Sequence, residues 1–176
     1  MRKLLSVLMS LTIFASLSGA TQAHERWRWD ANDVGGRLDV KWAAIDHHNR
    51  RFHFGVQTYN RWRQLLLKRR ANFIWIDMDT RRGRAMDYFA EVKYRRGRLR
   101  TRVYKIVDRP DTDVDGRRYV GYGSTEFRNR RLVLLRFQKG LVRPLRGYIR
   151  WRVVAATSRR YWDAVPSSGG LFRHSL

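Results

Sequence analysis

Hydrophobic and polar residues alternate with a period of two along most of the chain. The segments 37–45 and 51–59 are examples, and in the second of them Phe52 and Phe54 are separated by a polar residue. This period is typical of β-strands, because successive side chains point to opposite faces of a sheet. The polar residues 46–50 lie between the two segments and predict a turn, so we expect a β-hairpin here.

Further segments of the same kind follow at a spacing of about ten residues. The segment 73–78 is apolar on both faces, which favours a central strand that is covered on each side. No window of eleven or more residues keeps helical spacing convincingly, and 61–70 is the best candidate for a short helix. The other predicted strands lie at residues 86–94, 98–103, 117–122, 132–137 and 147–156.

Eight or nine short strands with polar turns predict an all-β fold. We expect an antiparallel β-sandwich of the jelly-roll kind, with at most one short helix. A closed barrel is the alternative arrangement. The length of 176 residues supports one domain and makes two domains a poorer description.

The first 23 residues have the three regions of a secretory signal peptide. Arg2 and Lys3 are followed by an uncharged apolar run at 4–17 and by small residues up to Ala23. The apolar run is shorter than the roughly 20 residues that a helix needs to cross a bilayer. We therefore predict cleavage after Ala23, with Ala20 as the alternative. This prediction gives a secreted, extracellular β-sandwich domain at 24–166 and a flexible tail at 167–176.

The composition adds a strong positive charge to this picture. Lys and Arg number 38 against 15 Asp and Glu, which gives a formal net charge of +23, and cysteine is absent. The absence of cysteine excludes disulfides, thiol catalysis and cysteine zinc sites. A basic field of this size attracts polyanions. Given the export signal, anionic polysaccharides or envelope polymers are the expected partners, and nucleic acid is expected to bind at most non-specifically.

Many arginines fall at predicted turns or on one face of the strand at 98–103. We therefore expect a monomeric, non-catalytic binding domain without a cofactor, whose arginines contact the polyanion. The alternative interpretation is that the arginines keep the domain soluble and prevent strand edges from pairing with other chains. The candidate ligand-binding residues are Arg81, Arg82, Arg95, Arg96, Arg98, Arg100 and Arg102.

Tryptophan supplies an alternative function, the binding of carbohydrate. Exposed indole rings can stack on the faces of sugars, and seven tryptophans are present. Trp42, Trp75 and Trp151 lie within predicted strands and are expected in the core. Four others are flanked by charged residues in predicted loops and are the candidates for sugar stacking: Trp27, Trp29, Trp62 and Trp162.

One acidic segment could bind calcium. Asp111, Asp113 and Asp115 alternate with other residues before Gly116, as in a loop that wraps an ion with oxygen ligands. An EF-hand needs an acidic residue at the twelfth loop position, where this chain has Tyr122, so at most a partial calcium loop is expected. The alternative is a polar surface turn.

A second group of carboxylates could act in catalysis. Asp77 and Asp79 end the strand at 73–78, and Asp87 follows one strand later. Asp77 and Asp87 could serve as acid and base in a glycoside hydrolase, which is a further alternative function. The favoured interpretation is structural, with aspartates at strand ends that accept hydrogen bonds from turn amides and pair with arginine.

Three short motifs resemble those of a known group of domains. They are the segments 33–39, 76–80 followed by Asp87 and Tyr88, and 162–166. They resemble secreted β-sandwich domains of unknown function that are common in actinobacteria and are similar to the jelly roll of carbohydrate-binding module family 9. The resemblance implies a sandwich and no activity. Such modules often place a Gly-rich calcium loop after the Asp-x-Asp pair, where this chain has the arginine-rich segment 81–84.

Overall fold

The computed structural model describes residues 26–81, 86–107, 116–143, 147–158, 162–166 and 170–176, without the side chains of 26 and 27. These residues form eleven strands and two short 3-10 helices. The chain order is β1 (Arg26–Trp29), β2 (Val40–His48), β3 (Arg51–Thr58), η1 (Gln64–Lys68), β4 (Asn72–Asp79), β5 (Tyr88–Arg95), β6 (Arg98–Val107), β7 (Gly116–Arg128), β8 (Leu132–Gln138), η2 (Lys139–Leu141), β9 (Tyr148–Thr157), β10 (Trp162–Val165) and β11 (Phe172–Ser175).

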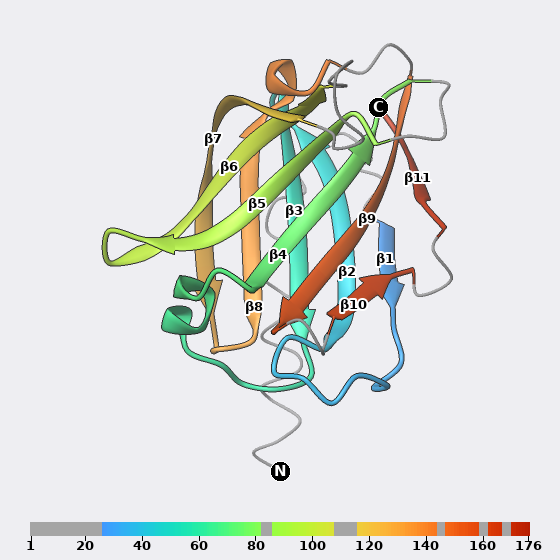
Figure 1. Ribbon diagram of the computed structural model, residues 1–176. Coiled ribbons are helices and arrows are strands. Elements are labelled where there is room, and N and C mark those ends of the chain that lie inside the picture. The colour runs from blue at the N-terminus through green and yellow to red at the C-terminus, as the bar shows by residue number, and fades with distance from the viewer. Residues whose placement is uncertain (1–25, 82–85, 108–115, 144–146, 159–161, 167–169) are drawn as a thin grey trace.

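All strands belong to one antiparallel sheet that curls into a nearly closed barrel (Figure 1). The strand order is β1-β2-β3-β8-β7-β6-β5-β4-β9-β10, and β11 pairs with β9 beside β10. The strands β4 to β8 form a meander whose last strand pairs with β3. The short helix η2 follows β8, and β9 then pairs with β4 at the other side of the meander.

Side-chain contacts close the remaining gap between the two ends of the sheet. We call this gap the seam; it separates β1 and β2 from β10 and β11, on the right of Figure 1. The backbone N–H of Val40 donates to Asp163 Oδ2 at 2.7 Å. Elsewhere along the seam, His47 Nδ1 lies 2.9 Å from His174 Nε2. The seam is thus bridged by side chains and not by a ladder of backbone hydrogen bonds among the described residues.

Alternate residues of the long strands fill the interior of the barrel. In β6, Leu99, Thr101 and Val103 are buried while the arginines between them face outward. Aromatic rings pack at the centre, where Phe54 lies 5.7 Å from both Phe137 and Trp151, measured between ring centroids. The predicted core position of Trp151 is confirmed. Trp42 is buried but lies on the outer face, where its ring covers Gly55, and Trp75 is half-buried on the outer face.

The all-β antiparallel prediction is confirmed, but the sandwich with eight or nine strands is wrong. A single sheet of eleven strands curls back toward its own first strand, which is close to the alternative of a closed barrel. The three strands that the alternation did not predict, β1, β10 and β11, have four residues each. A strand of that length shows too few alternations to be recognised.

Two further expectations are corrected. The segment 167–176 was predicted as a flexible tail, but β11 pairs with β9 within it, and His174 is fully buried. The helix expected at 61–70 is the 3-10 helix η1, which has five residues. No helix among the described segments has the length and apolar character required to span a bilayer.

Candidate functional site

Five of the predicted polyanion-binding arginines lie on the hairpin formed by β5 and β6. Arg95, Arg96 and Arg98 surround its turn, and Arg100 and Arg102 follow on the outward face of β6. Arg81 lies near the opposite end of the barrel, because it follows the last residue of β4. Arg82 lies outside the described residues. The predicted set is therefore not one surface, and its hairpin members form a separate basic projection.

Some of these arginines are partly neutralised by carboxylates. Arg95 lies 4.0 Å from Glu91, and Arg81 lies 3.6 Å from Asp87. The guanidinium of Arg102 lies over two tyrosines, 6.0 Å from the ring centroid of Tyr119 and 5.8 Å from that of Tyr122. Arg102 is thus part of a mixed aromatic and basic surface.

An aromatic strip crosses the outer face of the barrel from β4 to β7. Successive ring centroids along it lie between 3.9 and 6.0 Å apart. These lateral contacts explain why Phe73 and Trp75 can occupy the outer face of β4, although none of the described helices or strands forms a second layer over them. The strip ends in two exposed tyrosines. Its members are Phe73, Trp75, Phe89, Tyr104, Tyr119 and Tyr122.

The tryptophans predicted to stack on sugars do not form one surface. Trp29 and Trp162 are exposed, with 67% and 62% of their area accessible. Trp62 is 1% exposed, so its assignment as an exposed ring is wrong. Its indole packs on Phe127, with 4.3 Å between ring centroids, although its neighbours in sequence are arginines. Trp27 lies in β1, and its side chain is outside the description.

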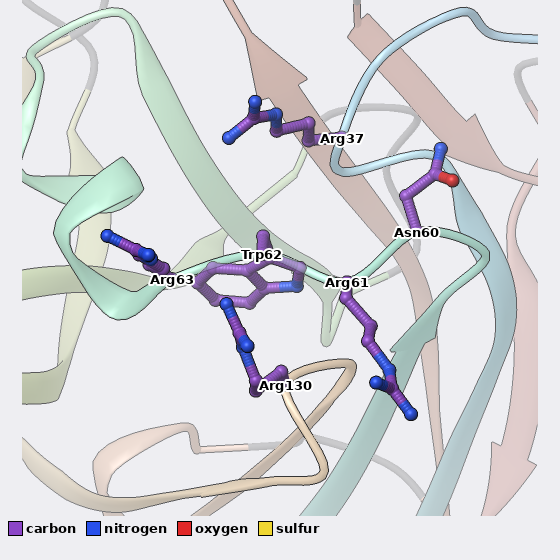
Figure 2. Close-up of a pocket in the computed structure, with 6 residues that line it drawn as sticks. All are labelled: Arg37, Asn60, Arg61, Trp62, Arg63 and Arg130. Atoms are coloured by element: carbon purple, nitrogen blue, oxygen red, sulfur yellow. The ribbon is translucent and has the colours of Figure 1, made fainter.

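The candidate site that the structure brings together is a pocket at the lower end of the barrel in Figure 1, shown in close-up in Figure 2. We call it the arginine pocket. Its volume is about 550 Å³. Trp62 lies between the surrounding arginines in Figure 2, and three connections contribute: the β1–β2 loop, the segment after β3 and the β7–β8 turn. The lining residues are Arg37, Asn60, Arg61, Trp62, Arg63 and Arg130.

Hydrogen bonds tie these three connections together. The backbone N–H of Trp62 donates to the carbonyl oxygen of Arg130 at 2.9 Å, which joins the segment after β3 to the β7–β8 turn. The side-chain amide of Asn60 donates to the carbonyl oxygen of Gly36 at 3.1 Å, which joins the same segment to the β1–β2 loop. The hydroxyl of Thr58 donates to the carbonyl oxygen of Asn60 at 2.7 Å. The backbone beneath the arginines is therefore well fixed.

The pocket carries four positive charges and no negative charge on its lining. Arg37, Arg61, Arg63 and Arg130 are all exposed, and none forms an ion pair with a carboxylate of the described residues. A guanidinium presents several donors in a planar fork that matches carboxylate, sulfate and phosphate groups. The arrangement can therefore bind an anion.

Arg130 is held in an unusual backbone conformation. Its φ is 56° and that of Asn129 is 50°, so both residues of this two-residue turn are left-handed. Such a turn suits the twist of a hairpin but favours Asn or Gly at both positions. An arginine here costs about 1 kcal/mol relative to a residue without a Cβ atom.

The aspartates considered for catalysis have structural partners. Asp77 pairs with Arg152 at 2.9 Å, and burial raises its pKa against the opposing effect of that arginine. Asp87 accepts hydrogen bonds from the backbone N–H and the hydroxyl of Thr80, both at 2.9 Å. Neither aspartate lines the arginine pocket. The predicted hydrogen bonds to a turn amide and the pairing with arginine are both found, although Asp77 pairs with an arginine of β9 and not with one of the arginine-rich segment that follows β4. The glycoside hydrolase alternative stays a prediction.

The predicted calcium loop cannot be compared with the structure, because Asp111, Asp113 and Asp115 lie outside the described residues. Among the residues described, Asp30, Asp33 and Asp163 are placed closely enough to hold a metal ion. They belong to the β1–β2 loop and to β10.

No known protein family, curated protein or solved structure matches this chain. The resemblance to secreted sandwich domains therefore stays a prediction, and the candidate site is argued from its geometry.

Sequence reasoning missed the arginine pocket. Arg61 and Arg63 were assigned to a short helix, and Arg37 to a strand, but all three precede the observed element by at least one residue. Asn129 and Arg130 are two polar residues just before the predicted strand at 132–137, and this polar pair was the available signal for a turn. The pocket is formed by three connections that lie side by side at one end of the barrel. Because they are far apart in the chain, no local sequence pattern predicts that they come together.

Proposed function

We propose that this protein is a non-catalytic binding domain for an anionic polymer of the cell exterior, and that the arginine pocket is its principal contact site. The observation that carries the proposal is the group of four exposed guanidiniums around one hollow, without an acidic residue among them. In a chain with a net charge of +23, this is a place where positive charge is concentrated and positioned.

The size and position of the pocket agree with this function. Its volume of about 550 Å³ falls in the range of roughly 300–1,000 Å³ that is usual for ligand sites. Each guanidinium can bind an oxyanion through two parallel hydrogen bonds. The hydrogen bonds among the three connections hold the backbone in place, so little ordering is required when the anion binds.

The choice of polymer rests on the predicted signal peptide. A polyanion outside the cytoplasm is an acidic polysaccharide or an envelope polymer more often than a nucleic acid. Acidic polymers of both kinds present carboxylate, sulfate or phosphate groups, which are the groups that arginine recognises.

The sharpest test compares two Arg→Gly substitutions at different positions that share the same backbone conformation. Arg130→Gly removes one cation from the pocket and relieves a left-handed arginine. Arg50→Gly does the same in the β2–β3 turn, where Asn49 and Arg50 have φ values of 49° and 60°. Both arginines also accept a backbone hydrogen bond, from Trp62 at 2.9 Å and from Lys139 at 2.8 Å respectively.

The two turns lie at opposite ends of β3, whose eight residues span about 26 Å. This separation exceeds the Debye length of about 8 Å at physiological salt, so Arg50 scarcely contributes to binding at the pocket. The measurement is the affinity for a heparin oligosaccharide of defined length, by fluorescence anisotropy at several salt concentrations. Arg130→Gly should weaken binding roughly tenfold, because a hydrogen bond to a charged group contributes about 1.5–3 kcal/mol.

The salt dependence gives a second result from the same data. Loss of one ionic contact should reduce the slope of log affinity against log salt by about 1 in Arg130→Gly. Arg50→Gly should keep the affinity within about twofold and the slope unchanged, since its charge is screened from the pocket. Equal effects of both variants would show that the charge acts as a whole and that the pocket is not a site.

Carbohydrate binding is a second candidate, and the exposed end of the aromatic strip favours it. Tyr119 and Tyr122 are 44% and 61% exposed and lie 5.0 Å apart between ring centroids. Rings placed in this way can stack on a sugar, as was expected of the tryptophans. Binding of a neutral glycan that is lost in Tyr122→Ala and is insensitive to salt would support this candidate over the first.

A further inference from the structure

Three aspartates meet where the seam of the barrel reaches its lower end. Asp30 and Asp33 belong to the β1–β2 loop, and Asp163 belongs to β10. One carboxylate oxygen of each lies within 4.8 Å of the corresponding oxygen of the other two. Asp163 Oδ2 already accepts a hydrogen bond from the backbone N–H of Val40. We call these residues together with Asp39 the aspartate cluster.

The cluster gathers four carboxylates that form no ion pair with an arginine or lysine in the part of the chain that the structure describes. Lys and Arg number 38 in this chain, and many of the described carboxylates have an arginine partner. No ion pair joins Asp30, Asp33, Asp39 or Asp163 to a described basic residue. The carboxylates that are paired with arginine are Asp77, Asp79, Asp87, Glu91 and Glu126.

Asp39 supplies an independent observation. It is 1% exposed, and neither of its carboxylate oxygens has a hydrogen-bond partner among the described residues. Burial raises its pKa to about 6, and the charges of Asp33 and Asp30 add to this effect, while the backbone of Val34 opposes it. The charge of Asp39 also raises the pKa of Asp163. Asp39 is thus a buried carboxylate that lies close enough to Asp33 and Asp30 for their negative charges to act on it.

We propose that the aspartate cluster binds a hard divalent cation, with Ca²⁺ as the best fit, between Asp30, Asp33 and Asp163, and that Asp39 completes the site. Calcium binds oxygen ligands at about 2.3–2.6 Å, so two oxygens on one ion lie no more than roughly 5 Å apart. The three oxygens all lie within 4.8 Å of one another, which satisfies this condition. Magnesium demands a strict octahedron and usually keeps several waters, so a set of three carboxylates from a loop and a strand suits the more flexible coordination of calcium better.

The bound cation would connect the two ends of the sheet. Asp30 follows β1 at one side of the seam, and Asp163 lies in β10 at the other. The seam is otherwise held by individual side-chain contacts at this end, such as the hydrogen bond from Val40. The cation also neutralises charges that repel one another without it. The site is independent of the arginine pocket and of the proposed function.

The competing explanation is that the carboxyl groups share protons. Asp30 and Asp163 are close enough to hydrogen-bond when one of them is protonated, and the pKa of Asp163 is raised to about 7, first by burial. A metal site and a shared proton respond differently to pH, because a cation binds best when the carboxylates are ionised. Calcium affinity should therefore increase from about pH 5.5 to pH 8.

The experiment measures binding directly and through stability. Terbium luminescence excited through tryptophan reports occupancy, since exposed Trp29 directly precedes Asp30. Calcium should displace terbium with a Kd on the order of 10⁻⁴–10⁻³ M, as in extracellular calcium modules, and should raise the temperature of thermal unfolding over that in EDTA.

Asp33→Asn is the test variant, because Asp33 is exposed and its replacement should not impair folding. It should weaken binding of terbium and calcium at least tenfold. Glu126→Gln is the matched control, since it removes an exposed carboxylate on β7 that pairs with arginine. The control should bind like the unmodified protein.

Two results would overturn the proposal. One is that calcium neither displaces terbium nor changes the unfolding temperature of the unmodified protein at pH 8. The other is that Asp33→Asn and Glu126→Gln bind terbium equally well, which would indicate weak binding at dispersed surface carboxylates.

Discussion

The buried carboxylate of Asp39 should make the stability of the metal-free protein fall as pH rises. Burial and the neighbouring aspartates raise its pKa from 3.8 to about 6. Between these values the folded protein holds a proton that the unfolded chain has released. Folded stability therefore decreases as pH rises, and the loss is complete once pH has passed the pKa of the folded state.

The size of the effect follows from the shift. A change from 3.8 to about 6 corresponds to roughly 3 kcal/mol, of which about 2.5 kcal/mol develops between pH 4 and pH 8. Asp39→Asn keeps the shape and removes the titration. Between pH 4 and pH 8, the free energy of unfolding of the variant should therefore increase by about 2.5 kcal/mol relative to that of the unmodified protein. For a chain of this length, that is roughly 5–10 °C in Tm.

The assay is urea unfolding followed by tryptophan fluorescence in EDTA at both pH values. The comparison of one variant at two pH values cancels the cost of burying an amide in place of a carboxyl group. Glu126→Gln should show the opposite trend, because a hydrogen bond from Arg128 lowers the pKa of Glu126, so its contribution is lost as pH falls. The free energy of unfolding of Asp39→Asn minus that of the unmodified protein should differ between pH 4 and pH 8. If this value is the same at both, the pKa of Asp39 is not raised in the folded protein.

Two further predictions concern packing. Phe54→Ala should destabilise the protein by about 3–5 kcal/mol in urea unfolding, because Phe54 is 2% exposed and contacts Phe137 and Trp151 in the barrel centre. A loss below about 1 kcal/mol would contradict a well-packed interior. Gly123→Ala should cost about 1–3 kcal/mol, since a Cβ atom there would lie 2.6 Å from the backbone oxygen of Arg136. Retention of full stability by this variant would show that β7 and β8 separate readily.

The strands were predictable from the sequence because alternation records which side chains face the core. Leu99 and Val103 are buried and Arg100 lies between them on the outside, as their spacing predicts. Alternation is the same in a sandwich and in a barrel, however. The choice between them depends on the β3–β8 and β4–β9 pairs, which join residues far apart in the chain.

The sites were less predictable, for the same reason. Asp30 and Asp163 are separated by 133 positions, and nothing near either residue shows that they meet. For Trp62 the local sequence was misleading. Its charged neighbours predicted an exposed ring, but the indole is buried and packs on Phe127. The composition of a segment thus predicts well whether its backbone forms a loop, but it predicts poorly whether one large side chain in it is buried.

The strand order also constrains how the chain folds. Arg51 pairs with Gln138, 87 positions away, and Asn72 pairs with Thr157, 85 positions away. Contacts between such distant residues form slowly, because the loop between them must first close. The meander from β4 to β8 can assemble early, and the edge of β4 then stays open until β9 has been synthesised. During that interval, repulsion between highly charged chains is expected to keep the open edges of two molecules apart, which is a role for the arginines before the barrel is complete.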